Sequence, residues 1–99
     1  MTPADIIYQQ LGGRRFVAMT GASLFFKAER GLKLGFKIPA AKDRISYVAI
    51  TLDEARDSYN LEFGRVAAHG FEIFRRFEDV YVDMLHDVFT EATGLRVSL

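Results

Sequence analysis

Few residues of this chain are of the types and at the spacings that catalysis requires. The sequence contains no cysteine and two histidines, His69 and His86. A serine nucleophile needs a general base beside it, and no serine here stands in the glycine-flanked turn that presents such a nucleophile. Asp83, His86 and Asp87 are close in sequence, but no second motif could complete a metal site. We therefore expect a protein that is not an enzyme and that holds no metal or other cofactor.

An acidic pattern near the end of the sequence is the first candidate binding site. Four carboxylates recur at every fourth position, and residues 77–95 contain no lysine or arginine. Like charges at this spacing destabilise a helix by a few tenths of a kcal/mol per pair. Successive carboxylates on a helix would lie ~6 Å apart, which is near the spacing of phosphates along a nucleic-acid strand. The pattern fits either a solvated helix face or a phosphate mimic for a basic partner, and its residues are Asp79, Asp83, Asp87 and Glu91.

A basic hairpin in the first half of the chain is the second candidate. Alternating apolar residues predict two strands joined by a three-residue loop, 29–31. The expected register places Lys27 opposite Lys33 and Phe25 opposite Gly35 on the exposed face. Like charges in this arrangement repel, so the face is either a solvated edge or a phosphate-binding surface. The candidate nucleic-acid-binding residues are Arg14, Arg15, Lys27, Lys33 and Lys37.

An α+β scaffold is expected to position these residues. Thr2 can cap a helix over residues 3–11, which the glycine pair at 12 and 13 ends. A second helix is expected from Glu78 to a C-cap at Gly94, with Tyr81, Met84, Leu85, Val88, Phe89 and Ala92 on its buried side and a docked apolar tail, 95–99, after it. Residues 71–77 fit a strand better than a helix, although phenylalanines three apart allow both. The expected fold is an antiparallel meander of about five to six strands with the two helices packed on one face. The strands cover residues 16–19, 24–28, 32–38, 45–52, 59–64 and 71–77.

Length and composition favour one folded domain, 1–99. The chain has 99 residues, of which 49% are hydrophobic. This is enough to form one hydrophobic core, and it excludes a disordered chain. We expect no signal peptide and no membrane span, and hence a cytoplasmic protein. The net charge of zero conceals +5 in residues 1–50 and −5 in residues 51–99. The halves either neutralise each other, expose a pole to a charged partner, or let copies self-associate as a homodimer or head to tail.

Two segments of the chain carry a resemblance to a known family. Residues 9–22, QQLGGRRFVAMTGA, and 81–95, YVDMLHDVFTEATGL, resemble a family of small proteins carried by phages, prophages and other mobile elements. The likeness extends more loosely to Gly31-Leu32 and to the strand Glu62-Phe63-Gly64-Arg65, and residues 40–58 do not align. Small cysteine-free phage proteins of this kind include anti-CRISPR inhibitors, which bind an effector complex. The resemblance implies a genomic setting and a mode of action, and it implies no site residues.

These observations lead to two expectations about function. The first is an inhibitor of host defence, an anti-CRISPR protein acting in the infected bacterium. It would block the nucleic-acid channel of a CRISPR effector with its acidic surface, helped by apolar groups such as Val82 or Phe89. The alternative is a phage accessory protein that binds nucleic acid directly through the basic hairpin face, with an affinity that falls steeply with salt.

Overall fold

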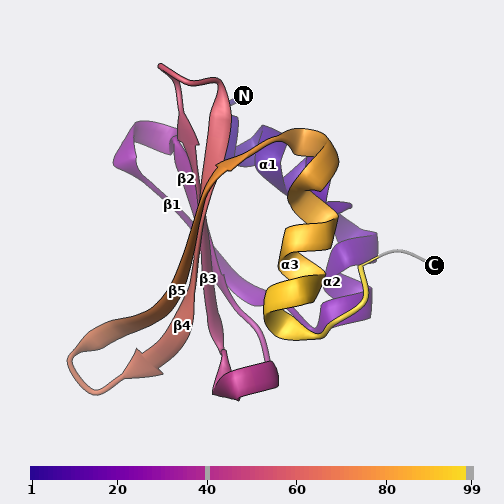
Figure 1. The fold of residues 1–99 in the computed structure, drawn as a ribbon, viewed down its shortest axis with the longest axis vertical. Coiled ribbons are helices and arrows are strands. Elements are labelled where there is room, and N and C mark those ends of the chain that lie inside the picture. The colour runs from indigo at the N-terminus through magenta and orange to yellow at the C-terminus, as the bar shows by residue number, and fades with distance from the viewer. Residues whose placement is uncertain (40, 98–99) are drawn as a thin grey trace.

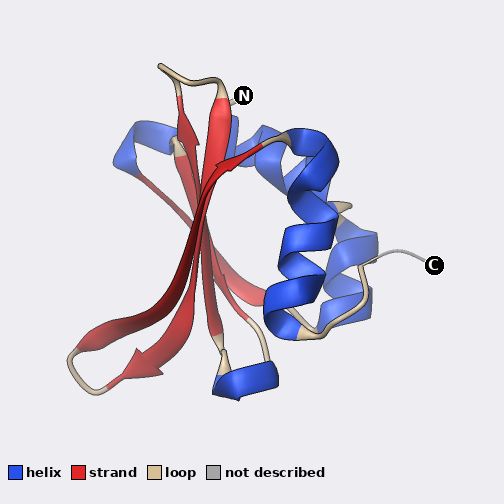
Figure 2. Ribbon diagram, in the orientation of Figure 1, coloured by secondary structure: helices blue, strands red, loops and turns tan. Residues whose placement is uncertain are grey.

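The computed structural model, which describes residues 1–39 and 41–97, has the expected α+β architecture. Five antiparallel strands form one sheet in the order β1-β2-β3-β4-β5. All three α-helices cover one face of this sheet (Figures 1 and 2). The strands are β1 (Ser23–Ala28), β2 (Lys33–Lys37), β3 (Tyr47–Asp53), β4 (Ser58–Ala67) and β5 (Gly70–Val80), and the helices are α1 (Pro3–Leu11), α2 (Arg14–Thr20) and α3 (Leu85–Thr93).

Helix α1 begins and ends where its sequence predicts. The Thr2 backbone N–H donates to the Asp5 carboxylate at 2.8 Å, and the Asp5 N–H donates to the Thr2 hydroxyl at 3.4 Å. This reciprocal capping box satisfies two backbone donors that the first turn leaves free. At the other end, Gly12 adopts a φ of 126°, a conformation that side-chain-bearing residues rarely adopt.

Residues 16–19 are helical, so the prediction of a strand there is wrong. Gly13, with a φ of 58°, redirects the chain directly after α1, and α2 then continues to a left-handed cap at Gly21. Phe16 and Thr20 are buried one turn apart, and the Thr20 hydroxyl donates to the Phe16 carbonyl at 2.8 Å. A run of four apolar residues is too short to distinguish a period of two from one of 3.6. The glycine pair therefore joins two helices instead of a helix and a strand.

The β1–β2 hairpin forms, but its register differs by one residue from the expected one. Phe26 pairs with Gly35 and Lys27 pairs with Leu34. The turn occupies residues 29–32, one residue more than predicted, because β2 begins only at position 33. A shift of one residue exchanges the two faces of a strand. Lys27 therefore lies on the helix side, and it does not face Lys33.

Strand β5 confirms the prediction for residues 71–77, whereas the helix expected from Glu78 begins later. The chain stays in the sheet as far as Val80, which is 2% exposed and pairs with Tyr59 of β4. It then passes through a 3₁₀ turn, η3 (Val82–Met84), before α3 starts. The burial of Val80 explains the delay, because leaving the sheet at position 78 would expose this side chain.

The core lies between the sheet and the helix layer. The ring of Phe16 packs edge-on against Phe36 and Phe89, with ring centroids 5.5 and 5.1 Å apart. Leu85, Val88, Phe89 and Ala92 of α3 are buried as predicted. The expected docking of the apolar tail is confirmed at Val97, which is 5% exposed, and residues 98–99 lie outside the described part.

Candidate protein-binding surface

The four carboxylates of the predicted acidic helix lie on three different elements. Asp79 belongs to β5, Asp83 to η3, and Asp87 and Glu91 to α3. Only the last two are one helical turn apart, so the prediction of a single acidic helix through all four is wrong. The physical reason is the continuation of β5 to Val80, which places the first carboxylate in the sheet.

Asp79 is held by an arginine of its own chain. The Arg56 Nη1 atom donates to both carboxylate oxygens of Asp79, at 2.9 and 3.1 Å. This hydrogen bond and the Asp79 charge raise the pKa of Arg56 above its usual range. Asp79 is therefore removed from the set of free carboxylates.

The other three carboxylates are exposed and form no ion pair within 4.0 Å in residues 1–39 and 41–97. Three large apolar side chains next to Asp83 in the chain are also exposed: Tyr81 at 49%, Val82 at 55% and Met84 at 41%. Unpaired negative charge and accessible apolar area thus occur on adjacent turns of the chain. We call this set the η3–α3 surface, and it consists of Tyr81, Val82, Asp83, Met84, Asp87 and Glu91.

The apolar part of this surface differs from the expected one. Tyr81 and Met84 were expected on the buried side of a helix, but they precede α3 and are exposed. Phe89 is fully buried in the core, so it cannot contact a partner, whereas Val82 is exposed as the binding hypothesis requires. His86 is half-buried, and its Nε2 lies 2.8 Å from the carbonyl oxygen of Leu11. This contact joins the start of α3 to the end of α1.

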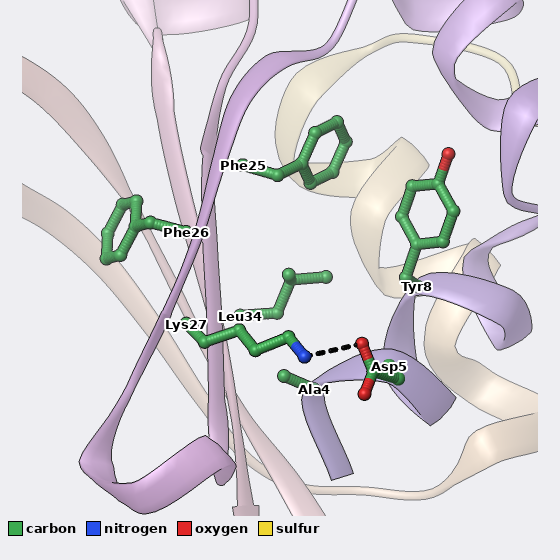
Figure 3. A pocket seen from close by; sticks show the side chains of 7 residues that line it. All are labelled: Ala4, Asp5, Tyr8, Phe25, Phe26, Lys27 and Leu34. Atoms are coloured by element: carbon green, nitrogen blue, oxygen red, sulfur yellow. Dashed lines mark ion pairs between the residues drawn. The ribbon is translucent and has the colours of Figure 1, made fainter. Parts of the chain in front are cut away.

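Lys27, the first lysine of the predicted basic face, is occupied by an intramolecular ion pair. Its Nζ lies 2.7 Å from the Asp5 carboxylate, across the hollow of about 400 Å³ between β1 and α1 (Figure 3). Phe25 and Tyr8 lie on the same side of β1, whereas Phe26 points to the opposite side. The hydrogen bond from Lys27 and those with Thr2 hold the pKa of Asp5 well below its ordinary value. The charges of Lys27 and Asp5 beside this hollow therefore neutralise each other.

The remaining basic candidates are not gathered on one surface. Lys33 and Lys37 lie on the sheet face away from the helices, and Lys33 is 3.8 Å from the Glu62 carboxylate. Arg14 and Arg15 begin α2, in the helix layer on the other side of the sheet (Figure 2). The five residues were expected to form one phosphate-binding face, and the fold separates them.

A small hollow next to the η3–α3 surface was not predicted. Its volume is about 250 Å³. The Tyr59 hydroxyl donates to Gln10 Oε1 at 2.5 Å, which links the start of β4 to α1. Ser58 is 2% exposed, and its Oγ has no hydrogen-bond partner in the described structure. We call this hollow the Ser58 pocket, and it is lined by Gln10, Leu52, Asp57, Ser58, Tyr59, Tyr81 and Val82.

Direct ion pairs neutralise only a small part of the opposite charges of the two halves in the described part of the chain. Among the ion pairs of the described residues, one, between Lys33 and Glu62, joins residues 1–50 to residues 51–99. The others lie within a half, as Lys27–Asp5 and Arg56–Asp79 do. The charge asymmetry of the sequence therefore persists on the folded surface.

Comparison of this chain with protein-family models, with curated proteins and with solved structures finds no match. Within the described ranges, no helix has the length and apolar character needed to cross a membrane. The same part of the chain contains no group of three or more histidine, aspartate or glutamate side chains placed to hold a metal ion. What the geometry does offer is a surface with unpaired carboxylates and exposed apolar groups.

Proposed function

We propose that the protein acts by binding another protein, and that the η3–α3 surface makes the contact. The observation that carries this proposal is the juxtaposition of three unpaired carboxylates with three exposed apolar side chains. Charged groups steer a partner and set its orientation, while buried apolar groups contribute most of the affinity. A partner with a basic groove lined by some apolar residues would complement both features.

The basic groove that best fits this surface is one that normally holds nucleic acid. Asp87 and Glu91 stand on successive turns of α3, ~6 Å apart along the axis, and Asp83 continues the series into η3. Carboxylates so spaced can occupy positions that phosphates would take. Taken together with the resemblance of two segments to small phage-carried proteins, this spacing leads us to propose an inhibitor of the anti-CRISPR kind, which blocks the nucleic-acid channel of an effector in an infected bacterium.

A plaque assay tests this function directly. The chain is expressed in a panel of bacterial strains, each with one type of CRISPR system directed against a phage. We expect plaque formation to be restored in at least one strain. Asp83→Lys with Asp87→Lys should abolish the effect without unfolding the protein, because both side chains are exposed. If plaque formation is restored in none of the strains, the anti-CRISPR form of the proposal is refuted.

A second double variant separates the local surface from total charge. Glu29→Lys with Glu54→Lys changes the net charge by the same amount, but at exposed carboxylates that form no ion pair among the described residues, in η1 (Glu29–Gly31) and in the turn between β3 and β4. We expect this control to inhibit as the natural chain does. Equal loss of inhibition in both double variants would remove the η3–α3 surface from the account.

Direct binding of nucleic acid is the alternative, and a gel-shift titration at low salt distinguishes it. The proposed inhibitor should give no shift, because its contact surface is negative. A shift that weakens steeply with added salt would favour the alternative. The separation of the five basic residues over two sides of the sheet is the reason that we prefer the inhibitor.

A further inference from the structure

The size of the Ser58 pocket limits what it can hold. Sites for drug-sized ligands usually measure roughly 300–1,000 Å³, whereas this pocket has a volume of about 250 Å³. A single side chain is therefore a better match than a cofactor. The pocket also borders the η3–α3 surface, because Tyr81 and Val82 line the one and belong to the other. A partner bound to that surface could insert a side chain here.

Two polar groups of the pocket, the Asp57 carboxylate and the Tyr59 oxygen, are available as hydrogen-bond acceptors. The Asp57 carboxylate forms no ion pair in the described part of the chain. The Tyr59 hydroxyl donates a hydrogen bond to Gln10, so its oxygen lone pairs remain available to accept one. No lysine, arginine or histidine lines the pocket. The lining therefore calls for a group that brings several donors and a positive charge.

The protonation of Tyr59 maintains this arrangement. Burial raises the pKa of Tyr59, and the neighbouring Asp57 carboxylate also raises it. An ordinary tyrosine ionises only near pH 10. The Tyr59 hydroxyl therefore stays neutral and continues to donate its hydrogen bond to Gln10. The Tyr59 oxygen then faces a ligand as an acceptor.

Ser58, one of the residues that line the pocket, has a hydroxyl without a hydrogen-bond partner. The residue is 2% exposed, and its Oγ is without a partner. A buried hydroxyl in this state costs about 1–3 kcal/mol, and departures of this kind from full hydrogen bonding concentrate at functional sites. The hydroxyl is closed to solvent, but rotation of this small side chain to another staggered position can redirect it.

We propose that the Ser58 pocket binds the guanidinium group of an arginine side chain. The Asp57 carboxylate and the Tyr59 oxygen accept two of its N–H groups, and the rotated Ser58 hydroxyl accepts a third. The planar guanidinium has five donors, which suits several acceptors at once. Its aliphatic stem lies along Val82, and the Tyr81 ring offers a face to the cation. The inference deepens the proposed function, on which it rests for the source of the arginine, a basic partner.

A titration without any partner protein tests the pocket. The isotope-labelled full chain is titrated with Nα-acetyl-L-arginine amide while its amide NMR spectrum is recorded. We expect saturable shifts confined to residues 57–59 and to Tyr81 and Val82. Nα-acetyl-L-citrulline amide, which has a neutral urea in place of the guanidinium, should bind about tenfold more weakly, since charge-assisted hydrogen bonds are the stronger ones. Equal binding of both compounds, or shifts spread evenly over all acidic residues, would overturn the proposal.

Three variants sharpen the result. Asp57→Asn removes the charge, and asparagine, like aspartate, tolerates the φ of 52° at this position. This variant should weaken arginine binding about tenfold. Ser58→Ala should weaken it by a smaller factor of about three, the loss of one neutral hydrogen bond. Glu29→Gln removes an exposed carboxylate that lies outside both the pocket and the η3–α3 surface, so it should leave arginine binding unchanged. Unaltered affinity in Asp57→Asn would refute the assignment of the pocket.

The outcomes distinguish the pocket from the proposed function. If arginine amide binds as expected while Asp83→Lys with Asp87→Lys still restores plaques, the pocket is supported and the η3–α3 surface is not the inhibitory one. If the double variant loses inhibition but arginine amide does not bind, the proposed function stands and the pocket proposal is overturned.

Discussion

At the scale of single residues, the Ser58 hydroxyl that we propose to bind arginine also lowers the stability of the fold. Its Oγ is buried without a hydrogen-bond partner, so Ser58→Ala should raise the free energy of unfolding by about 1 kcal/mol. Ser46→Ala is the matched control, because the Ser46 hydroxyl accepts a hydrogen bond from the Val66 N–H at 3.4 Å. That variant should be neutral or slightly destabilised. Urea unfolding measures both, and a loss of stability in Ser58→Ala would show that its hydroxyl is satisfied.

The ion pair between Asp5 and Lys27 makes stability depend on pH in the acid range. Because the pKa of Asp5 is lowered in the folded protein, its contribution is complete above its ordinary pKa of 3.8 and is lost as the pH falls below that value. Urea unfolding between about pH 5 and pH 2 should show this loss. Asp5→Asn and Lys27→Met should each reduce the slope. An unchanged slope in both variants would mean that other carboxylates cause the acid dependence.

Individual residues of the site were predictable to different degrees. Asp83, Asp87 and Glu91 were identified from their spacing, since exposed carboxylates at a regular interval are visible in a sequence. The Ser58 pocket was not predictable, because it joins residues from α1, the β3–β4 turn and η3 that meet only after folding. The pairing of Asp79 with Arg56 was missed for the same reason, since 23 positions separate the two residues.

At the scale of elements, two glycines of the sheet have different tolerances for a side chain. A Cβ at Gly64 would collide with the carbonyl oxygen of Glu72 in the neighbouring strand, where β4 and β5 shift register. A Cβ at Gly35 would meet the Phe26 ring, which can move aside. Gly64→Ala should therefore lose about 2–3 kcal/mol of stability and Gly35→Ala clearly less, since overpacking costs about 1–3 kcal/mol.

Thermal and urea unfolding of the two alanine variants measures this difference. Equal losses would indicate that the β4–β5 irregularity can relax as easily as an aromatic side chain. A retained β5 is also a condition for the η3–α3 surface, because the burial of Val80 fixes the point at which the chain leaves the sheet.

Elements with long or reinforced signals were predictable, and those with short signals were not. The Thr2 cap and the glycine pair identified α1, and the strands β3 and β4 followed from alternating and β-branched residues. The short α2 was mistaken for a strand because four apolar residues carry no clear period. The start of α3 was placed too early because Tyr81 and Met84 continue the apolar spacing of the helix toward its N-terminus, while the pairing of Val80 with Tyr59 is a tertiary contact that the sequence does not reveal.

At the scale of the whole molecule, the separation of charge along the sequence survives folding. One ion pair of the described residues, Lys33–Glu62, connects the positive and negative halves. Opposite exposed poles also permit self-association, which was expected as a third alternative. Light scattering at two ionic strengths tests it, and a monomer at both would exclude association through the poles.

The same separation predicts how the inhibitor finds its partner. Long-range attraction between opposite charges accelerates association and is screened by salt over about 10 Å at 0.1 M. Asp83→Lys with Asp87→Lys should therefore reduce the association rate with an effector strongly at low salt and less at high salt. Association rates measured by surface binding at two salt concentrations check this expectation. A rate that is insensitive to salt would show that charge does not guide the encounter.

Hydrogen exchange on the purified complex tests the central claim most directly, using the effector that the plaque assay identifies. The account predicts that binding slows exchange of the backbone amides of residues 81–91 and of the adjoining residues 57–59. It also predicts no change in the β1–β2 hairpin, which lies across the sheet. Slowed exchange confined to that hairpin, with residues 81–91 exchanging as in the free protein, would contradict it.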